Sequence, residues 1–182
     1  MQRNAPIRHS SCGFTAIELC VVVGICAALV GQAVPAMGKL HKEQKLRSTS
    51  DALATDLRFA RSEAARLGDS VFFRVSGKGT AACYVLHTGS KDDCDCAGGQ
   101  AVCKKPGSQV IKAEWLPTNQ PVQISSNAET LEFQHRQGLV TQTGSIELRL
   151  NNGPAIRQVV AITGRVRNCY VGTAISNMPK CA

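Results

Sequence analysis

The chain has one long apolar run behind a short polar segment. Residues 14–38 carry a single charged side chain, Glu18, whereas residues 1–13 are polar and basic and contain no acid. A helix over the apolar run would be about 37 Å long, enough to cross a hydrocarbon core of about 30 Å. We therefore expect one transmembrane helix, and the basic residues ahead of it predict a cytoplasmic amino terminus.

A helical period continues beyond Gly38 into a more polar segment. Apolar residues recur there as one stripe of an amphipathic helix: Leu46, Leu53, Leu57, Ala60, Ala64 and Leu67. Four charged residues fall off this stripe and are expected in solvent: Arg58, Arg61, Glu63 and Arg66. Gly68 is expected to end the helix, and Pro35 is expected to bend it.

Short runs of β-branched and aromatic residues follow Gly68, separated by Gly, Asn and Pro. They predict strands at 70–76, 82–88, 109–116, 122–126, 131–140, 145–151 and 156–167, the fifth turning at Gln137-Gly138. One long helix followed by antiparallel strands predicts an α+β fold, in which the amphipathic helix covers one face of a sheet.

Composition adds a basic net charge and no sign of catalysis. Lys and Arg number 21 against 13 Asp and Glu, which gives a formal net charge of +8. This balance favours anionic partners such as nucleic acid or acidic lipid, although a basic surface also serves solubility alone. The histidines at 41, 87 and 135 have neither the spacing of a metal site nor a neighbouring nucleophile, and no phosphate-binding glycine loop is present. We expect no catalytic residues, no cofactor, no metal and no small-molecule substrate.

Nine cysteines are many for a cytosolic chain of this length. Cys12, Cys20 and Cys26 lie in or beside the apolar run. The others suggest up to three disulfides in an oxidising compartment: Cys83, Cys94, Cys96, Cys103, Cys169 and Cys181. Their pairing is left open, except that Cys169 with Cys181 is favoured because this bond would close a short terminal loop.

The loop that holds three of these cysteines also invites metal interpretations. Asp92, Asp93 and Asp95 do not follow the spacing of a known calcium loop, so a solvated acidic turn is preferred over a calcium site. Only one residue separates Cys94 from Cys96, and structural zinc sites space their cysteines more widely. Disulfides to different partners are therefore preferred over zinc.

The stretch "GFTAIELCVVVGICAALVGQAVPAM" resembles the class III signal of type IV pilins and pseudopilins. The resemblance implies that a prepilin peptidase cuts after Gly13, that Phe14 is N-methylated, and that the chain assembles into a filament. A cleaved secretory signal is the alternative, but the apolar run is longer than such signals have. After the cut, a neighbouring subunit's amino terminus is the natural partner of the Glu18 carboxylate; the alternative is an acid that snorkels to the interface.

Three later stretches resemble the FimT/GspH-type minor pilins: "LATDLRFARSEAARLGDSVFF", "LEFQHRQGLV" and "VVAITGRVRNC". Members serve type IV pili or type II secretion, and the FimT branch is implicated in binding DNA during natural transformation. Gly164, Arg165 and Arg167 match the Gly-Arg-x-Arg element of that branch. If 156–167 is a strand, both arginines project from one face, where Lys180 of the tail extends the patch. The alternative is an edge-strand pair that only discourages edge pairing.

The expected organisation is a leader at 1–13, a transmembrane helix at 14–38, its amphipathic continuation at 39–67 and a periplasmic β-rich domain at 68–182. The resemblance implies an inner-membrane protein with one span, which joins other pilins and binds double-stranded DNA without sequence preference. The alternative function is an H-type minor pseudopilin of a type II secretion system. The sequence alone leaves open the machine, the filament neighbours and whether the acidic loop binds calcium.

Overall fold

The structure is a computed structural model that describes residues 13, 15–77, 82–116, 121–151 and 153–181, with the helix but not the side chains described at 33–36. Its one long helix, α1 (Ala16–Leu67), begins where Thr15 accepts a hydrogen bond from the Glu18 backbone N–H at its hydroxyl, over 3.4 Å. It ends at Gly68, which has a φ of 69° and donates its N–H to the Ala64 carbonyl. The bend expected at Pro35 lies among the residues whose side chains are outside the description, and it stays a prediction.

The chain divides into two compact units, Met1–Leu40 and His41–Ala182. In the first unit, every described side chain of α1 is exposed, including Ile17, Leu29 and Leu40. By length and composition this helix can cross a membrane. The apolar run is therefore free to meet lipid or another protein on all sides.

In the second unit, α1 buries the stripe that the sequence predicted, with two corrections. Leu46, Leu53, Leu57, Ala60 and Ala64 are all buried. Leu67, however, is 42% exposed, because it lies in the last turn before Gly68. Glu63 was expected in solvent but is 8% exposed, and its carboxylate accepts two hydrogen bonds from the Arg66 guanidinium.

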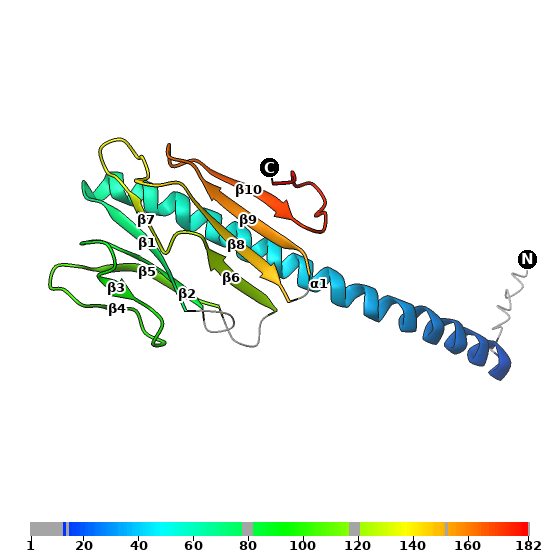
Figure 1. The fold of residues 1–182 in the computed structure, drawn as a ribbon. Coiled ribbons are helices and arrows are strands. Elements are labelled where there is room, and N and C mark those ends of the chain that lie inside the picture. Colours follow the sequence, from blue (N-terminus) through cyan, green and yellow to red (C-terminus); the bar gives the residue numbers. More distant parts are fainter. Residues whose placement is uncertain (1–12, 14, 78–81, 117–120, 152, 182) are drawn as a thin grey trace, which may run out of the picture. The chain divides into compact units, whose positions relative to one another are not determined.

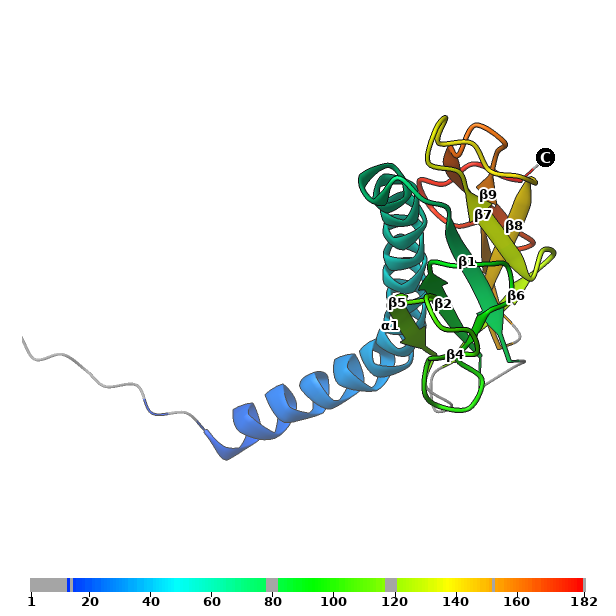
Figure 2. The same ribbon diagram turned by 90° about the vertical axis from the view of Figure 1, so that its left-hand side faces the viewer.

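Two four-stranded antiparallel sheets and one short hairpin make up the rest of this unit (Figures 1 and 2). The first sheet has the order β5-β2-β1-β7 and consists of β1 (Val71–Ser76), β2 (Cys83–His87), β5 (Val110–Trp115) and β7 (Thr130–Phe133). The second has the order β10-β9-β8-β6 and consists of β6 (Val122–Ser126), β8 (Gly144–Leu150), β9 (Ala155–Val160) and β10 (Val166–Val171). The hairpin pairs β3 (Cys94–Asp95) with β4 (Val102–Cys103). This arrangement is the predicted α+β fold.

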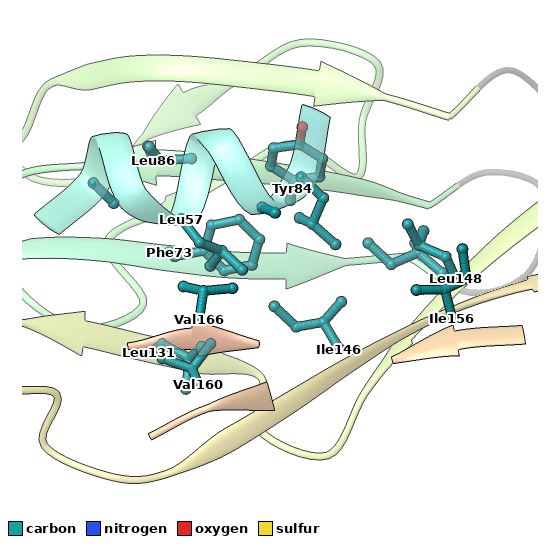
Figure 3. Packing of buried hydrophobic residues seen from close by; sticks show 14 of the residues in the cluster. Leu57, Phe73, Tyr84, Leu86, Leu131, Ile146, Leu148, Ile156, Val160 and Val166 are labelled. Carbon is teal, nitrogen blue, oxygen red and sulfur yellow. The ribbon is translucent and has the colours of Figure 1, made fainter. Parts of the chain in front are cut away.

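The core lies between α1 and both sheets. Figure 3 shows Leu57 of the helix beside Phe73 of β1. Val166 of β10 and Ile146 of β8, both from the second sheet, lie below them in this view. A buried polar bond joins the helix to the second sheet as well: the side-chain amide of Gln158 donates to the Ser50 hydroxyl over 2.7 Å. Apolar burial and this bond together fix α1 on the sheet that ends in β10.

Five strands lie where the sequence predicted them, within one residue at either end. The segment at 131–140 is not one strand that turns at Gln137-Gly138, because β7 ends at Phe133 and only an isolated bridge joins Phe133 to Val140. The predicted strand at 156–167 is also wrong. Residues 162–164 form a turn that separates β9 from β10, so the chain reverses just before the arginines of interest.

Three disulfides occupy the six cysteines of this unit: Cys83–Cys96, Cys94–Cys103 and Cys169–Cys181. The last is the pair that the sequence analysis favoured. Cys94 and Cys96 bond to different partners, so their thiolates are not available to a zinc ion. The Cys94–Cys103 bond joins the two strands of the hairpin, and the Cys83–Cys96 bond ties the hairpin to β2, an inner strand of the first sheet.

Candidate nucleic-acid interface

The turn between β9 and β10 carries the Gly-Arg-x-Arg element. Two backbone hydrogen bonds close it, from Gly164 N–H to the Ala161 carbonyl and from Ala161 N–H to the Arg165 carbonyl. Gly164 has a φ of 72°, and a Cβ at this position would lie 2.4 Å from the Gly138 carbonyl oxygen. Only glycine fits this combination of a left-handed backbone and a close approach, so Gly164 sets the shape of the turn.

Arg165 and Arg167 lie on either side of a buried residue. Val166 is 8% exposed and packs into the core, whereas both arginines are exposed. Although Arg165 precedes the strand instead of lying in it, the alternation still directs both side chains away from the core. Neither guanidinium forms an ion pair with any carboxylate that the structure describes.

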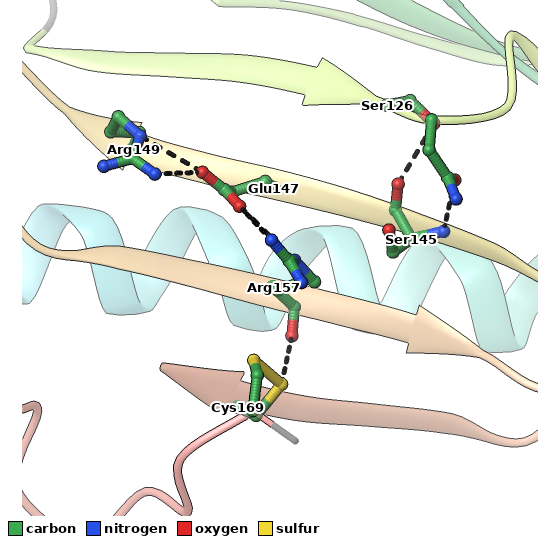
Figure 4. Close-up of polar contacts among 8 residues, drawn as sticks. Ser126, Ser145, Glu147, Arg149, Arg157 and Cys169 are labelled. Atoms are coloured by element: carbon green, nitrogen blue, oxygen red, sulfur yellow. Dashed lines mark hydrogen bonds and ion pairs between the residues drawn. A yellow bond between two sulfur atoms is a disulfide. The ribbon is translucent and has the colours of Figure 1, made fainter. Parts of the chain in front are cut away.

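Other arginines of the same sheet are held by carboxylates. Arg149 of β8 and Arg157 of β9 both donate to Glu147, at 3.1 and 2.9 Å for Arg149 Nε and Arg157 Nη2 (Figure 4). Their charge is thus partly neutralised within the protein. The contrast identifies Arg165 and Arg167 as the cations of this sheet that have the most freedom to meet an anion from outside.

The carboxyl-terminal tail returns along the open edge of β10. Tyr170 N–H donates to the Pro179 carbonyl, Cys181 N–H donates to the Tyr170 carbonyl, and the Cys169–Cys181 disulfide holds the contact. Lys180, within this segment, is exposed. The tail pairs with the strand at Tyr170, three residues beyond Arg167, so it leaves the arginine end of the edge open.

Beside the turn lies a groove of about 940 Å³ that we call the basic groove. Its walls are α1, the loop after β7 and the turn itself, which meet at one end of the unit in both views (Figures 1 and 2). The cations that line it are Arg58, Arg61, Arg136 and Arg165, with His135 beside them, and its described lining contains no carboxylate. Arg58 and Arg61 were expected in solvent and are exposed, whereas no pattern in the sequence indicated Arg136.

Arg61 joins the helix to the turn through two glycines. A Cβ at Gly138 would lie 2.8 Å from Arg61 Nε, and a Cβ at Gly164 would lie 3.1 Å from the same atom. The arginine side chain therefore packs closely over both glycines, and an added Cβ at either position would have to displace it. The spacing of Arg58 and Arg61 along one helix face was visible in the sequence, but their meeting with Arg136 depends on the tertiary fold.

The acidic loop at 91–96 is not the solvated turn that the sequence predicted. Asp93 is 5% exposed and accepts hydrogen bonds from the Ser90 N–H and the Ser108 hydroxyl, both at 2.9 Å, while Lys105 Nζ lies 3.0 Å away. The hydrogen bond with Lys105 has the largest effect and lowers the pKa of Asp93. The bonds from Ser90 and Ser108 lower it as well, whereas burial raises it, and the resulting pKa is about 2. Asp92 and Asp95 both face Arg74. Within the described residues no group of three or more His, Cys, Asp and Glu forms a metal site.

At the amino-terminal end, Gly13 and Glu18 are exposed, and Phe14 lies outside the described residues. Glu18 is in the first turn of α1, three residues after the capping Thr15. This is the spacing of a capping box, in which a Glu or Gln side chain supports the start of a helix. The bond that the structure describes here is the one from the Glu18 backbone N–H to Thr15, and the intersubunit contact of the Glu18 carboxylate stays a prediction.

Comparisons with known proteins place this fold in a family. Two crystal structures of the type IV minor pilin FimU from Pseudomonas aeruginosa are similar at 14% and 15% identity, with TM-scores of 0.49 and 0.48. The match covers 68% of this chain in each case, and 87% and 91% of theirs. No curated protein matches the chain. A sequence model of the family described as Type II transport protein GspH matches residues 49–164, which is more than half of the 182 residues. This match confirms the resemblance found in the sequence, and the chain belongs to the type IV pilin-like family of GspH and FimT proteins.

Proposed function

We propose that this protein is a minor pilin of a type IV pilus that binds double-stranded DNA without sequence preference during natural transformation. In this proposal a prepilin peptidase cuts between Gly13 and Phe14, Phe14 is N-methylated, and the apolar part of α1 spans the inner membrane once. The unit that follows lies in the periplasm until the chain joins other pilins in the filament.

The state of Arg165 and Arg167 is the observation that carries the DNA-binding part. Both guanidiniums are exposed, and neither meets a described carboxylate, whereas Arg149 and Arg157 on the same sheet share Glu147. A planar guanidinium matches a phosphate with two parallel hydrogen bonds. Contacts of this kind do not read base sequence, which suits a protein that takes up arbitrary DNA.

The surroundings of the two arginines support the same proposal. Gly164 gives the turn a fixed shape, and the Cys169–Cys181 disulfide holds the tail that carries Lys180. Because these elements are already ordered, little conformational entropy is lost when a phosphate binds.

Binding of a labelled DNA duplex to the full-length protein in nonionic detergent tests the proposal, with fluorescence anisotropy as the measurement. Replacing both arginines (R165Q with R167Q) should weaken binding about tenfold at low salt and flatten the slope of log Kd against log salt by about 2. The matched control is R66Q with R149Q, which removes two charges that Glu63 and Glu147 already hold. Equal affinity of the two double variants would reject the site.

A minor pseudopilin of a type II secretion system is the second candidate. The description of the matched family model, Type II transport protein GspH, favours it. A deletion strain separates the two functions: loss of protein secretion with normal DNA uptake supports the pseudopilin, and the opposite result supports the minor pilin.

A further inference from the structure

We propose that the basic groove seats the phosphodiester backbone of the bound nucleic acid, so that the binding site extends from the β10 edge onto α1. This inference rests on the proposed DNA-binding function and names a second contact region for the same ligand. It assigns phosphate contacts to Arg58 and Arg136, which the Gly-Arg-x-Arg element does not include.

The charge of the groove is the first argument. Arg58, Arg61, Arg136 and Arg165 line one hollow of about 940 Å³, and its described lining offers them no carboxylate. Elsewhere the protein pairs such groups: Arg66, on the same helix, is held by Glu63, which raises the pKa of Arg66 and lowers that of Glu63. Four guanidiniums gathered without a counter-charge create a local potential that an anion from outside relieves.

The position of Arg61 is the second argument. Its side chain crosses Gly138 and Gly164, so it links the helix, the loop after β7 and the turn of Arg165. Arg61 is a positioning residue in this proposal, because its side chain packs against both glycine-bearing walls of the groove. A groove whose walls are held in advance binds a rigid, repeating anion with a small ordering cost.

Continuity with the turn is the third argument. Arg165 belongs both to the groove and to the pair with Arg167. A ligand that follows this line meets cations on both sides of the turn, and a phosphodiester backbone supplies one negative charge at each step along it. An acidic peptide of a partner pilin is the other ligand that the charge of the groove allows, but it offers carboxylates at irregular intervals.

The test replaces two groove arginines whose side chains are exposed and outside every described ion pair, R58Q with R136Q. Binding of a labelled duplex to the full-length protein in detergent should weaken about tenfold at low salt, and the salt slope should fall by about 2, as expected for two lost phosphate contacts. The control is again R66Q with R149Q, and circular dichroism on heating confirms that each variant is folded.

The outcomes distinguish this inference from the function on which it rests. If R165Q with R167Q weakens binding while R58Q with R136Q matches the control, the groove proposal is overturned and the DNA-binding turn stands. If the unmodified protein does not bind DNA at low salt, both fail. Displacement of the duplex by polyglutamate of equal total charge, at equal concentration, would also overturn the proposal, because it would assign the groove to an acidic peptide.

Discussion

Asp56 is the residue that ties α1 to the first sheet by charge. Its carboxylate is 5% exposed and accepts hydrogen bonds from the Tyr84 hydroxyl and from Lys112 Nζ, each at 2.7 Å. Burial and the hydrogen bond to Asp56 raise the pKa of the Tyr84 hydroxyl. The hydrogen bond to Asp56 also raises the pKa of the Lys112 ammonium group. Both shifts favour the protonated forms that donate to Asp56.

Replacing Asp56 with alanine should destabilise the fold. The change leaves a buried hydroxyl and an ammonium group without their acceptor, which costs about 1–3 kcal/mol of unfolding free energy. Urea unfolding followed by fluorescence of Trp115 measures it. Asp51→Ala, at an exposed position on the same helix, is the control, and a common midpoint for the two variants would contradict the prediction.

Asp93 should make the acidic loop sensitive to strong acid. Its pKa is about 2 in the folded protein, against an ordinary value of 3.8 for an aspartate in the unfolded chain. The ionised carboxylate therefore stabilises the fold fully above about pH 4, and this stabilisation is lost as the pH falls toward 2. The thermal midpoint of the natural chain should therefore drop between pH 4 and pH 2 more steeply than that of an Asp93→Asn variant. Parallel curves over this range would show that the carboxylate is not held as described.

Single residues also mark what the sequence was unable to predict. The apolar stripe of α1 was predictable because its period is local, but the buried Asp56 and Gln158 were not. Each is buried together with a hydrogen-bond partner that is distant in sequence: Tyr84 and Lys112 for Asp56, and Ser50 for Gln158. A polar side chain in a helix or strand pattern is expected in solvent until the fold supplies such a partner.

Among the elements, the turn between β9 and β10 determines where Arg165 and Arg167 lie. It was missed because β-branched and apolar residues run through 156–162 as in a continuous strand, and because the need for glycine at 164 arises from Gly138, which is distant in sequence. The five strands that match their predicted ranges, β1, β2, β5, β6 and β8, were predicted well because each has its own turn residues at both ends.

Gly164→Ala should therefore be more harmful than a glycine replacement at an open position. Gly172 is the matched control, since it has a similar φ, 78°, but no atom within 4 Å of an added Cβ. The positive φ should lower the unfolding free energy of both variants by about 1 kcal/mol. Gly164→Ala should lower it further, because the added Cβ clashes with the Gly138 carbonyl oxygen. The midpoint temperature of thermal unfolding should be clearly lower for Gly164→Ala than for Gly172→Ala. Equal midpoints would mean that the turn accommodates the added methyl group without loss of stability.

At the scale of the whole molecule, two variants test whether Glu18 acts through its charge, as the proposed assembly contact requires, or only through helix capping. Glu18→Gln keeps the capping-box hydrogen-bonding side chain but loses the charge, whereas Glu18→Ala loses both. If the carboxylate pairs with a neighbouring subunit's amino terminus, both variants should reach the membrane in normal amounts and fail to enter filaments. Immunoblots of membrane and sheared pilus fractions measure this, and normal incorporation of Glu18→Gln would leave helix capping as the sole role.

The family could be predicted from the sequence because its signal is concentrated in contiguous stretches, above all "GFTAIE" and the apolar run behind it. The candidate site was only half predictable. Arg165 and Arg167 lie in one short element, but Arg58, Arg61 and Arg136 come from a helix and a loop that meet only in the folded unit. No local pattern records such a meeting.

The exposed apolar side chains of the first unit limit how the chain can travel from the membrane to a filament. Ile17 is 74% exposed, Leu29 is 64% exposed and Leu40 is 57% exposed, and their neighbours are similar. Dissolving this surface in water is unfavourable at about 25 cal/mol for each Å², so the chain has no useful route through the aqueous phase. A chain that moves from membrane to filament must pass directly from one apolar environment to the other. The rate of incorporation should then follow the number of chains per unit area of membrane, and lateral diffusion in the bilayer should set its upper limit.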